Sequence, residues 1–382
     1  NLSAEYRGPA YANRLGKRWV WSTHSRTRTQ ISVNNVSSGL LEYGRVLLDT
    51  SLRGTAWSLD QRSALPFTLQ ANAYQELGAT LAVTLVDAKK MKISAGGTAK
   101  YLMGLGHFSM VSQGMQLHTF GRDSMQILQS DLQVSYSETQ IFQRIMNGLV
   151  GGLPSFRNIL GHGLGFDFGV AVEGGKGGGN AQMKERWLGD PTARNYHWRL
   201  AASVTDFGKL NYGSQVNTFA FSNTTPVTLK TDSAFFQAFQ QGGSSGYRYF
   251  EDFAKRNLNY RQETGTVHFV LPTQLHLQGD LRIMAGFYTA FHWQQSLFSI
   301  KSVGFRQPSS FVLIPRIETK WIEVAMPVGL TNDYRKANMG ACVRVGPVFL
   351  GSDNFLSNLM TNNIKGMNVY FGLSSSIGKI KK

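Results

Sequence analysis

Eight histidines are the residues best suited to acid–base or metal chemistry, and their spacing argues against both. They are His24, His107, His118, His162, His197, His268, His276 and His292. No two are four residues apart, as a helical metal site requires, and no two are two residues apart, as neighbours on one strand face would be. The single cysteine, Cys342, adds no ligand cluster. We therefore expect no metal site and no cofactor.

Catalysis would require further groups at a recognisable spacing. The glycine run from Gly174 to Gly179 surrounds Lys176, but it lacks the spacing and the Ser or Thr of a phosphate-binding loop. A barrel enzyme could assemble a site from separate strands, and the groups available for this are His24, His197, His292, Asp131, Asp167 and Glu173. Nothing in the sequence selects such a set, so we expect that the protein is not an enzyme.

The segment from Trp19 to Val33 predicts one long strand with two unlike faces, because alternate side chains of a strand point to opposite sides. One face carries Trp19, Trp21, Thr23, Ser25, Thr27, Thr29, Ile31 and Val33. The other carries Arg18, His24, Arg26, Arg28, Gln30 and Ser32, interrupted by Val20 and Ser22. Tryptophans at one end of the apolar face would suit a lipid headgroup boundary.

The same alternation recurs along the chain and predicts further strands. It occurs in 69–81, 91–101, 164–173, 198–205, 281–293, 339–345 and 367–374. Half of each strand favours hydrocarbon and half favours water. A closed membrane barrel satisfies both, because it leaves no hydrogen-bonding edge in lipid. We therefore predict an all-β fold, a transmembrane antiparallel β-barrel, as a single domain over residues 1–382. A soluble propeller is the alternative fold, but no repeat of about 40–50 residues is visible.

The polar strand faces carry side chains that would line the barrel interior. They are His24, Arg26, Arg28, Lys100, Asp167, Arg199, Arg282, Arg316, Glu318 and Arg344. This distribution also bears on the net charge of +16. The cations do not form one cluster and no base-recognition motif accompanies them, so we expect no nucleic-acid partner. Composition agrees with a barrel: hydrophobic residues are 42%, charged residues are 16%, and no run of about 18 apolar residues predicts a helical span.

Short and long connections alternate, as in outer-membrane barrels with short periplasmic turns and long extracellular loops. Tight connections are predicted at Asn13–Lys17, Asp87–Lys90, Gln278–Asp280 and Gly329–Lys336, and longer segments at 35–65, 138–162, 213–265 and 351–363. Separate strands are predicted at 107–119 and 124–137, and a bulge is predicted between Trp321 and Ile322. The total is about fourteen strands if one N-terminal strand is missing. No signal peptide opens the chain, so we expect a mature or N-terminally incomplete protein.

Aromatic residues cluster in 233–260 without a period of two, and their spacing predicts short amphipathic helices in the largest loop. Those that could form a partner-binding loop are Phe235, Phe236, Phe239, Tyr247, Tyr249 and Phe250. The same residues could instead form the small core of the loop itself.

Several phrases, taken in order, resemble a known group of proteins. They are Gly163–Val170, Trp198–Leu200, Val204–Gly208, Pro315–Trp321 and Arg344–Ser352. Together they resemble Bacteroidota outer-membrane barrels of a domain-of-unknown-function family in the wider FadL/PorV-like set. The resemblance runs from Tyr6 to about Gly372 and implies fourteen strands. For the polar residues of these phrases, Asp167, Asp206, Arg316, Glu318 and Arg344, we expect mutual ion pairing rather than activity.

The resemblance implies two kinds of function. PorV-type relatives are partners in the type 9 secretion apparatus. FadL-type relatives pass hydrophobic molecules through the barrel and use an N-terminal hatch, which this chain starts too late to show. We predict a structural or accessory subunit of a larger complex for secretion, barrel assembly or uptake, in the bacterial outer membrane. Its partners would be lipid, lipopolysaccharide and other outer-membrane proteins or lipoproteins. The alternative is a FadL-like transporter for a hydrophobic or anionic small molecule.

Overall fold

The computed structural model describes residues 2–34, 36, 60–61, 66–88, 90–120, 124–137, 159–175, 196–213, 216–230, 245–263, 266–284, 286–298, 306–319, 321–360 and 369–373. These residues form one continuous antiparallel sheet, so the predicted all-β class is confirmed. Their two helices are α4 (Ser245–Asn257) and α5 (Phe355–Met360). No described helix has the length and apolar character needed to cross a membrane.

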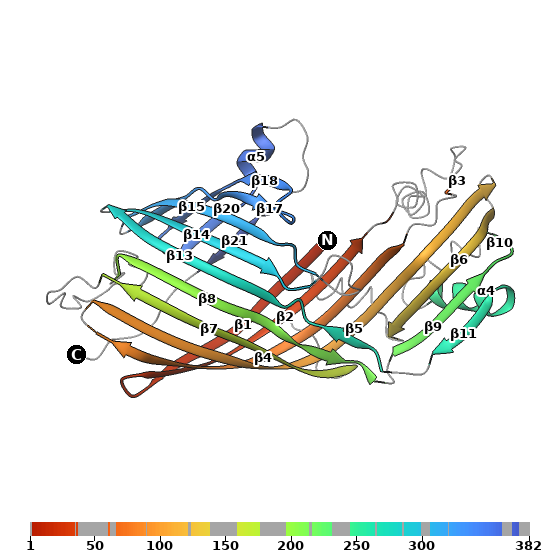
Figure 1. The fold of residues 1–382 in the computed structure, drawn as a ribbon, viewed down its shortest axis with the longest axis horizontal. Helices are drawn as coiled ribbons and strands as arrows, with labels where there is room; N and C mark the ends of the chain where they lie inside the picture. The colour runs from red at the N-terminus through yellow and green to blue at the C-terminus, as the bar shows by residue number, and fades with distance from the viewer. Residues whose placement is uncertain are drawn as a thin grey trace.

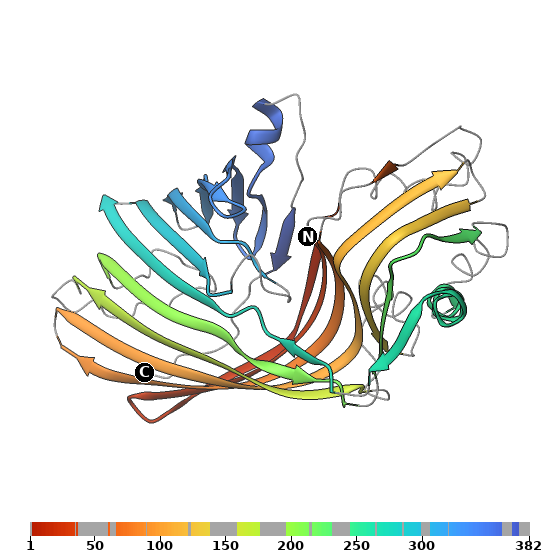
Figure 2. The same cartoon turned by 45° about the vertical axis from the view of Figure 1, so that its right-hand side comes forward.

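Most of the sheet is a single series of strands, which we call the ladder. In spatial order it contains β1 (Leu2–Leu15), β2 (Trp19–Asn34), β4 (Phe67–Asp87), β5 (Met91–Phe120), β7 (Gly161–Gly174), β8 (Trp198–Asn211), β13 (Gln274–Met284), β14 (Phe287–Ser296), β15 (Ser310–Glu318), β16 (Ile322–Ala325), β19 (Ala341–Val345), β20 (Val348–Ser352) and β21 (Tyr370–Leu373). Two short strands, β17 (Val328–Thr331) and β18 (Lys336–Met339), continue the β16 and β19 positions. The ladder curves into an open trough (Figure 1, Figure 2). Within the described residues the sheet is not closed, and β1 and β21 have one neighbour each.

Most short connections meet at one end of the ladder, which we call the turn end, whereas the β17–β18 turn within the predicted connection Gly329–Lys336 lies at the opposite end. Those at the turn end join β1 to β2, β4 to β5, β13 to β14, β15 to β16 and β19 to β20. Gly16, Gly286 and Gly346 adopt positive φ in three of these turns, which a residue without a Cβ does readily. The predicted turns at Asn13–Lys17 and Asp87–Lys90 are therefore confirmed.

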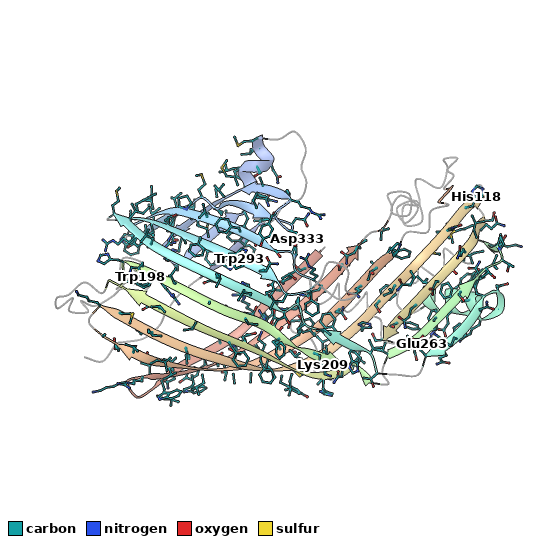
Figure 3. All side chains as sticks on the ribbon, viewed as in Figure 1. His118, Trp198, Lys209, Glu263, Trp293 and Asp333 are labelled. Atoms are coloured by element: carbon teal, nitrogen blue, oxygen red, sulfur yellow. The ribbon has the colours of Figure 1, made fainter. Side chains whose placement is uncertain are left out.

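The sheet forks along β5. Its residues from Met91 to Gly104 pair with β7, whereas those from Phe108 to Phe120 pair with β6 (Ser124–Ser137). Beyond β6 lie β9 (Val216–Asn223) and β11 (Asn259–Glu263), with β10 (Val227–Lys230) and β3 (Asp60–Gln61) at the margins. These strands, α4 and the adjoining parts of β4 and β5 form what we call the lobe, at the right of Figure 1. Figure 3 labels His118 and Glu263 in the lobe and Trp198 in the ladder.

Two bulges lie at the fork. Leu105 is the extra residue of β5, since Ala73 pairs with Gly106 and Tyr74 with Gly104. Asp206 lies in the bulge of β8, where Phe166 pairs with Phe207 and Phe168 with Val204. Past this bulge, β8 changes its partner from β13 to β12 (His268–Val270). The bulges thus lie where the strands change neighbours.

The two sides of the sheet differ throughout, and we call them the polar face, with Lys100, and the apolar face, with Tyr101. In the ladder the apolar face is exposed, as at Phe168 (57%) and Leu200 (50%). In the lobe the same face is covered. There it forms a core whose strand residues include Phe67, Phe108, Leu132, Val134, Phe219 and Phe221, and α4 packs Tyr249, Phe253 and Ala254 against it. The same face of the sheet is apolar on both sides of the fork, but this face is exposed in the ladder and buried in the lobe.

Several predictions about the strands are wrong. Residues 281–293 are not one strand but contain the turn between β13 and β14, and the predicted loop 213–265 contains β9, β10 and β11. Gln278–Asp280 is not a turn but the middle of β13, where the Phe291 ring of β14 lies over Gly279. The change of phase at Trp321 is not a bulge but the turn of the β15–β16 hairpin. Residues 91–101 and 107–119 are not separate strands, because β5 is continuous over 30 residues. In β13 and β5, glycines within the pattern predict a break that cross-strand pairing does not produce.

Candidate functional site

A group of buried charged side chains lies on the polar face near the fork. Six neighbouring strands contribute to it: β1, β2, β4, β5, β7 and β8. We call it the ionic cluster, and its members are Glu5, Arg26, Arg28, Tyr74, Glu76, Lys100, Asp167 and Asp206. Every strand except β8 places its members by the simple alternation that turns every second side chain to this face.

Lys100 is the centre of the cluster. Its Nζ lies 2.6 Å from Oδ1 of Asp167 and 2.6 Å from Oδ1 of Asp206, and its side chain is 1% exposed. Asp206 also accepts a hydrogen bond from Arg28 Nη1 at 2.7 Å. An ammonium group between two carboxylates, with a guanidinium behind one of them, is a charge-assisted network that ties β2, β5, β7 and β8 together.

Glu76 completes the network on β4, where its side chain is fully buried. Arg26 Nε donates to Glu76 Oε2 at 2.8 Å, and Arg28 Nη1 lies 3.5 Å from Glu76 Oε1. Arg28 Nε in turn donates to Oε2 of Glu5 on β1, at 3.3 Å. The four carboxylates of the cluster are thus each within ion-pair distance of a cation. Removing one partner from such a buried arrangement costs about 3–5 kcal/mol.

The bulge in β8 is what brings Asp206 into the cluster. Asp206 has φ of 56°, a left-handed conformation that Asp tolerates better than most residues. Its backbone N–H donates to Asp167 Oδ1 at 2.8 Å, and its carbonyl accepts from Thr273 Oγ1 at 2.9 Å. The bulge therefore turns one extra carboxylate toward Lys100, and the hydrogen bond to Asp167 holds the bulge in place.

An apolar layer covers one side of the cluster. Phe269 and Leu271, from β12 and the residues after it, pack with Tyr74, Leu102 and Leu210 in a small core on the polar face. The rings of Tyr74 and Phe269 are 5.7 Å apart. This layer keeps water from the Lys100 side of the cluster and strengthens its electrostatics by lowering the local dielectric constant.

The chemistry that this arrangement supports is mutual neutralisation. The carboxylates are engaged by cations, and no member of the cluster is a histidine, serine or cysteine. The ring of His24 lies nearby over Gly78, where a Cβ would come within 2.2 Å of the ring. The cluster therefore acts as a lock between strands, in line with the ion pairing expected for Asp167 and Asp206.

A second ionic group lies on β13, β14 and β15. Arg316 donates from Nη2 to Asp280 Oδ2 at 2.7 Å and from Nε to Glu318 Oε1 at 2.6 Å. Its guanidinium carbon lies 5.2 Å from the ring centroid of Tyr288. This is a buried pair of carboxylates around one arginine, stacked on an aromatic ring.

The other residues predicted for the polar faces are more dispersed. Arg344 pairs with Glu323 at 2.8 Å, and Arg199 lies 3.7 Å from Glu173. Arg282 is half-buried, and its backbone N–H donates to the His197 carbonyl. The ten predicted residues thus occupy several groups along the face rather than one site.

Sequence reasoning missed the carboxylates that complete these groups: Glu5, Glu76, Asp280 and Glu323. Glu76 and Asp280 carried a signal, because a carboxylate on the polar side of an alternating strand needs a cation beside it. The identity of that cation depends on strand register, which alternation alone does not give.

The predicted partner-binding loop is described only in part. Tyr247, Tyr249 and Phe250 lie in α4, which confirms the predicted helix, whereas Phe235, Phe236 and Phe239 lie outside the described residues. Tyr249 packs against the core of the lobe. Glu251 of the same helix accepts hydrogen bonds from Tyr136 at 2.7 Å and from Tyr260 at 2.9 Å, so α4 is fixed to β6 and β11.

The described histidines do not form a metal centre. His276 Nδ1 and His292 Nε2 are 3.3 Å apart, and Thr205 Oγ1 lies 3.0 Å from the other nitrogen of His276. This diagonal pair across a hairpin could not be recognised from sequence spacing. In the part of the chain that the structure describes, no three His, Cys, Asp or Glu side chains lie close enough to hold an ion.

These features define a class: an antiparallel all-β protein with ion pairs on one face of its ladder and exposed apolar side chains on the other. The chain belongs to a family of unknown function, DUF5723, whose family model matches residues 1–353. Neither the curated proteins nor the solved structures include a match to this chain.

Proposed function

We propose that this protein is an integral outer-membrane β-barrel that serves as a structural or accessory subunit of a larger outer-membrane complex. We also propose that its family belongs to the wider FadL/PorV-like set of Bacteroidota barrels. The observation that carries the membrane part is the exposed apolar face of the ladder. Its side chains are exposed on the same strands whose opposite face holds the ionic cluster.

The composition of the apolar face supports burial in hydrocarbon. Large exposed side chains on this face of the ladder include Leu77, Leu81, Tyr101, Leu164, Phe168, Leu200, Leu281, Leu313, Val324, Val343 and Leu350. A soluble monomer rarely exposes so many large apolar side chains on one continuous face of a sheet. Trp19, Trp198 and Trp321 are exposed at the turn end, where an aromatic girdle is expected at the headgroup level.

Strand direction supports closure with one more strand. Twelve antiparallel pairings separate β1 from β21, so these two edges run in the same direction. One further strand, antiparallel to both, would complete the hydrogen bonds and bring the thirteen strands to fourteen. An even number is the rule for single-chain bacterial barrels, and an open edge is not tolerated in lipid.

A structural role is favoured over transport by the way in which the polar face is filled. The carboxylates of the ionic cluster pair with cations of the same cluster, and an apolar layer covers one side of it. The lobe extends the sheet beyond the ladder and offers a folded surface for other proteins. Its apolar face is already covered by α4, so contacts there would use its polar exterior.

The test of membrane integration uses brominated lipids, which quench tryptophan on contact. After reconstitution, bromines near the headgroups should quench Trp19, Trp198 and Trp321 strongly, and those at the bilayer centre should quench them weakly. A closed barrel should also migrate faster on unboiled than on boiled gels. Complete extraction of the protein by alkaline carbonate would refute the proposal.

The test of the subunit role is native mass spectrometry after extraction in mild detergent. We expect a defined partner in fixed stoichiometry, retained by the wild-type chain and lost when the exposed lobe residues Asp131 and Gln133 are both changed to Lys. A monomer under every mild condition would contradict the role.

A FadL-like transporter is the second candidate. It is favoured by a cavity of about 300 Å³ on the polar face, lined by Arg199, Gln278, Asp280 and His292 among others. This candidate predicts single-channel conductance or retained hydrophobic ligand. A protein that neither conducts nor retains a ligand would remove it.

A further inference from the structure

A cleft lies between the polar face of the lobe and the segment that contains β12. It has a volume of about 330 Å³, at the lower end of the usual range for ligand pockets. Its floor is formed by side chains of β4, β5, β6, β9 and β11, and its wall by residues 266–270. The polar lining residues are Gln70, His107, Ser109, Gln133, Ser135, Thr218, Glu263, Thr266 and His268. Because both branches of the fork contribute, the cleft exists only where the sheet divides.

The floor of this cleft contains buried polar atoms that have no hydrogen-bond partner among the described residues. They are His107 Nε2 and Gln70 Oε1, and both residues are at most 5% exposed. Asn72 Nδ2 and Gln30 Oε1 lie in the same layer and are also unpartnered there. Buried polar groups in folded proteins are nearly always paired, so a run of four on adjacent strands is unusual.

The protonation state of His107 determines which ligand groups its ring can bind. Burial lowers the pKa of His107 to about 4, so the ring is neutral near pH 7. Its Nδ1 lies 2.6 Å from Asn72 Oδ1, an acceptor, and therefore carries the proton. Nε2 is then left with a lone pair, and the Oε1 of Gln70 is a second unpartnered acceptor in the same cleft. Both atoms require a donor such as a hydroxyl group.

The charges of the lining argue against an ionic ligand. Glu263 is already engaged by Gln133 and by Arg261, whose Nη2 lies 3.0 Å from Glu263 Oε1. The hydroxyls of Thr218 and Ser135 are 3.0 Å apart and can each donate or accept. An anion would meet a carboxylate and a neutral imidazole. A cation would meet a carboxylate that is already neutralised.

Apolar side chains complete the lining, namely Val111, Val267, Phe269 and Val270. A ligand that matches this surface has hydroxyl groups along its edge and C–H groups on its faces. We propose that this cleft is a binding site for a neutral saccharide, which is oriented by His107 and Gln70. The proposal is independent of the subunit role, because it rests only on the lining of the cleft.

The test is isothermal titration calorimetry of the full chain in a detergent without a sugar headgroup. The probes are glucose, galactose, N-acetylglucosamine and lactose, with glucose 6-phosphate and glucosamine as charged comparators. We expect at least one neutral sugar to bind, and the charged ones to bind roughly tenfold more weakly or not at all. Absence of heat for every neutral sugar up to about 50 mM, or tighter binding of a charged sugar, would overturn the proposal.

Variants locate the site. His107→Leu and Gln70→Leu should each weaken binding roughly tenfold or more. Ser109→Trp should abolish binding by filling the cleft while leaving the buried floor intact, which guards against misfolding of the first two. Gln129→Leu, at an exposed lobe position outside the cleft, is the matched control and should bind as the wild type does. Wild-type affinity in Ser109→Trp would place the binding elsewhere and contradict the assignment.

Discussion

The ladder and the lobe are made from strands of the same alternating kind, but they treat the apolar face in opposite ways. In the ladder that face is exposed, and charged groups pair with one another on the other side. In the lobe a helix, α4, covers it. The exposed and the covered part of the apolar face occur on the same strand in some cases. On β4, Leu77 is exposed at 42%, whereas Ala73 is buried at 5% on the same face. Alternation thus shows that a strand has an apolar side, but not what covers that side.

The largest expected effect comes from removing the charge at the centre of the ionic cluster. Lys100→Met leaves Asp167 and Asp206 without their shared ammonium group, and should lower the free energy of unfolding by about 3–5 kcal/mol. Urea titration in lipid vesicles would measure it. Lys209→Met, at an exposed position on β8, is the control and should change stability by less than about 0.5 kcal/mol. Equal effects would mean that the ionic cluster does not lock the ladder.

A charge on the apolar face separates the two regions directly. Phe168→Arg places a cation on the exposed face of the ladder, and in a bilayer it should cost about 2–4 kcal/mol if Phe168 lies near the midplane. The same vesicle titration applies. Gln129→Arg, on the exposed surface of the lobe, should be almost neutral. A tolerated Phe168→Arg would indicate that water, not lipid, covers this face.

A smaller effect is expected where α4 is fixed to the lobe. Glu251→Gln weakens the hydrogen bonds from Tyr136 and Tyr260, so the helix should be less stably docked by about 1 kcal/mol. Hydrogen exchange of the α4 amides would show faster opening there and no change in the ladder. Asp252→Asn, at an exposed site on the same helix, is the control. Faster exchange throughout the ladder would mean that the two regions unfold together.

The smallest effect is the pH dependence of the same contact. Burial raises the pKa of Glu251, but hydrogen bonds from Lys255, Tyr136 and Tyr260 outweigh it and hold the pKa below the ordinary value of 4.5. The charged carboxylate therefore stabilises docking above that value, and this contribution is lost as pH falls through the lowered pKa. Exchange of the α4 amides should quicken only in that acidic range. A change centred between pH 6 and 8 would point to another group.

Much of the strand pattern could be predicted from sequence, because a period of two is a local property. It correctly places Arg28, Lys100 and Asp167 on one face. It does not predict that Lys100 meets Asp206, because that contact depends on a bulge 106 residues away along the chain. Likewise, β5 continues through Gly104 and Gly106 because the whole length of β4 pairs with it there.

The covering of the lobe was the least predictable feature. The aromatic residues of 233–260 predict a helix, but not the surface on which it rests. That surface is formed by β6, β9 and β11, which pair with one another beyond the fork, in the lobe branch of the sheet. The candidate cleft beside it was unpredictable for the same reason, since its two sides belong to different branches.

The bulge at Leu105 exchanges the faces to which odd-numbered and even-numbered residues of β5 point. Before it, the even-numbered residues of β5 share the side of Lys100; after it, the odd-numbered ones from His107 to Val111 do, until a second bulge at Gln113. Without this extra residue, Phe108 and Met110 would lie on the same side as Lys100, and His107 would be buried in the apolar core beneath α4. An insertion or deletion of one amino acid here would leave either half correctly phased but never both.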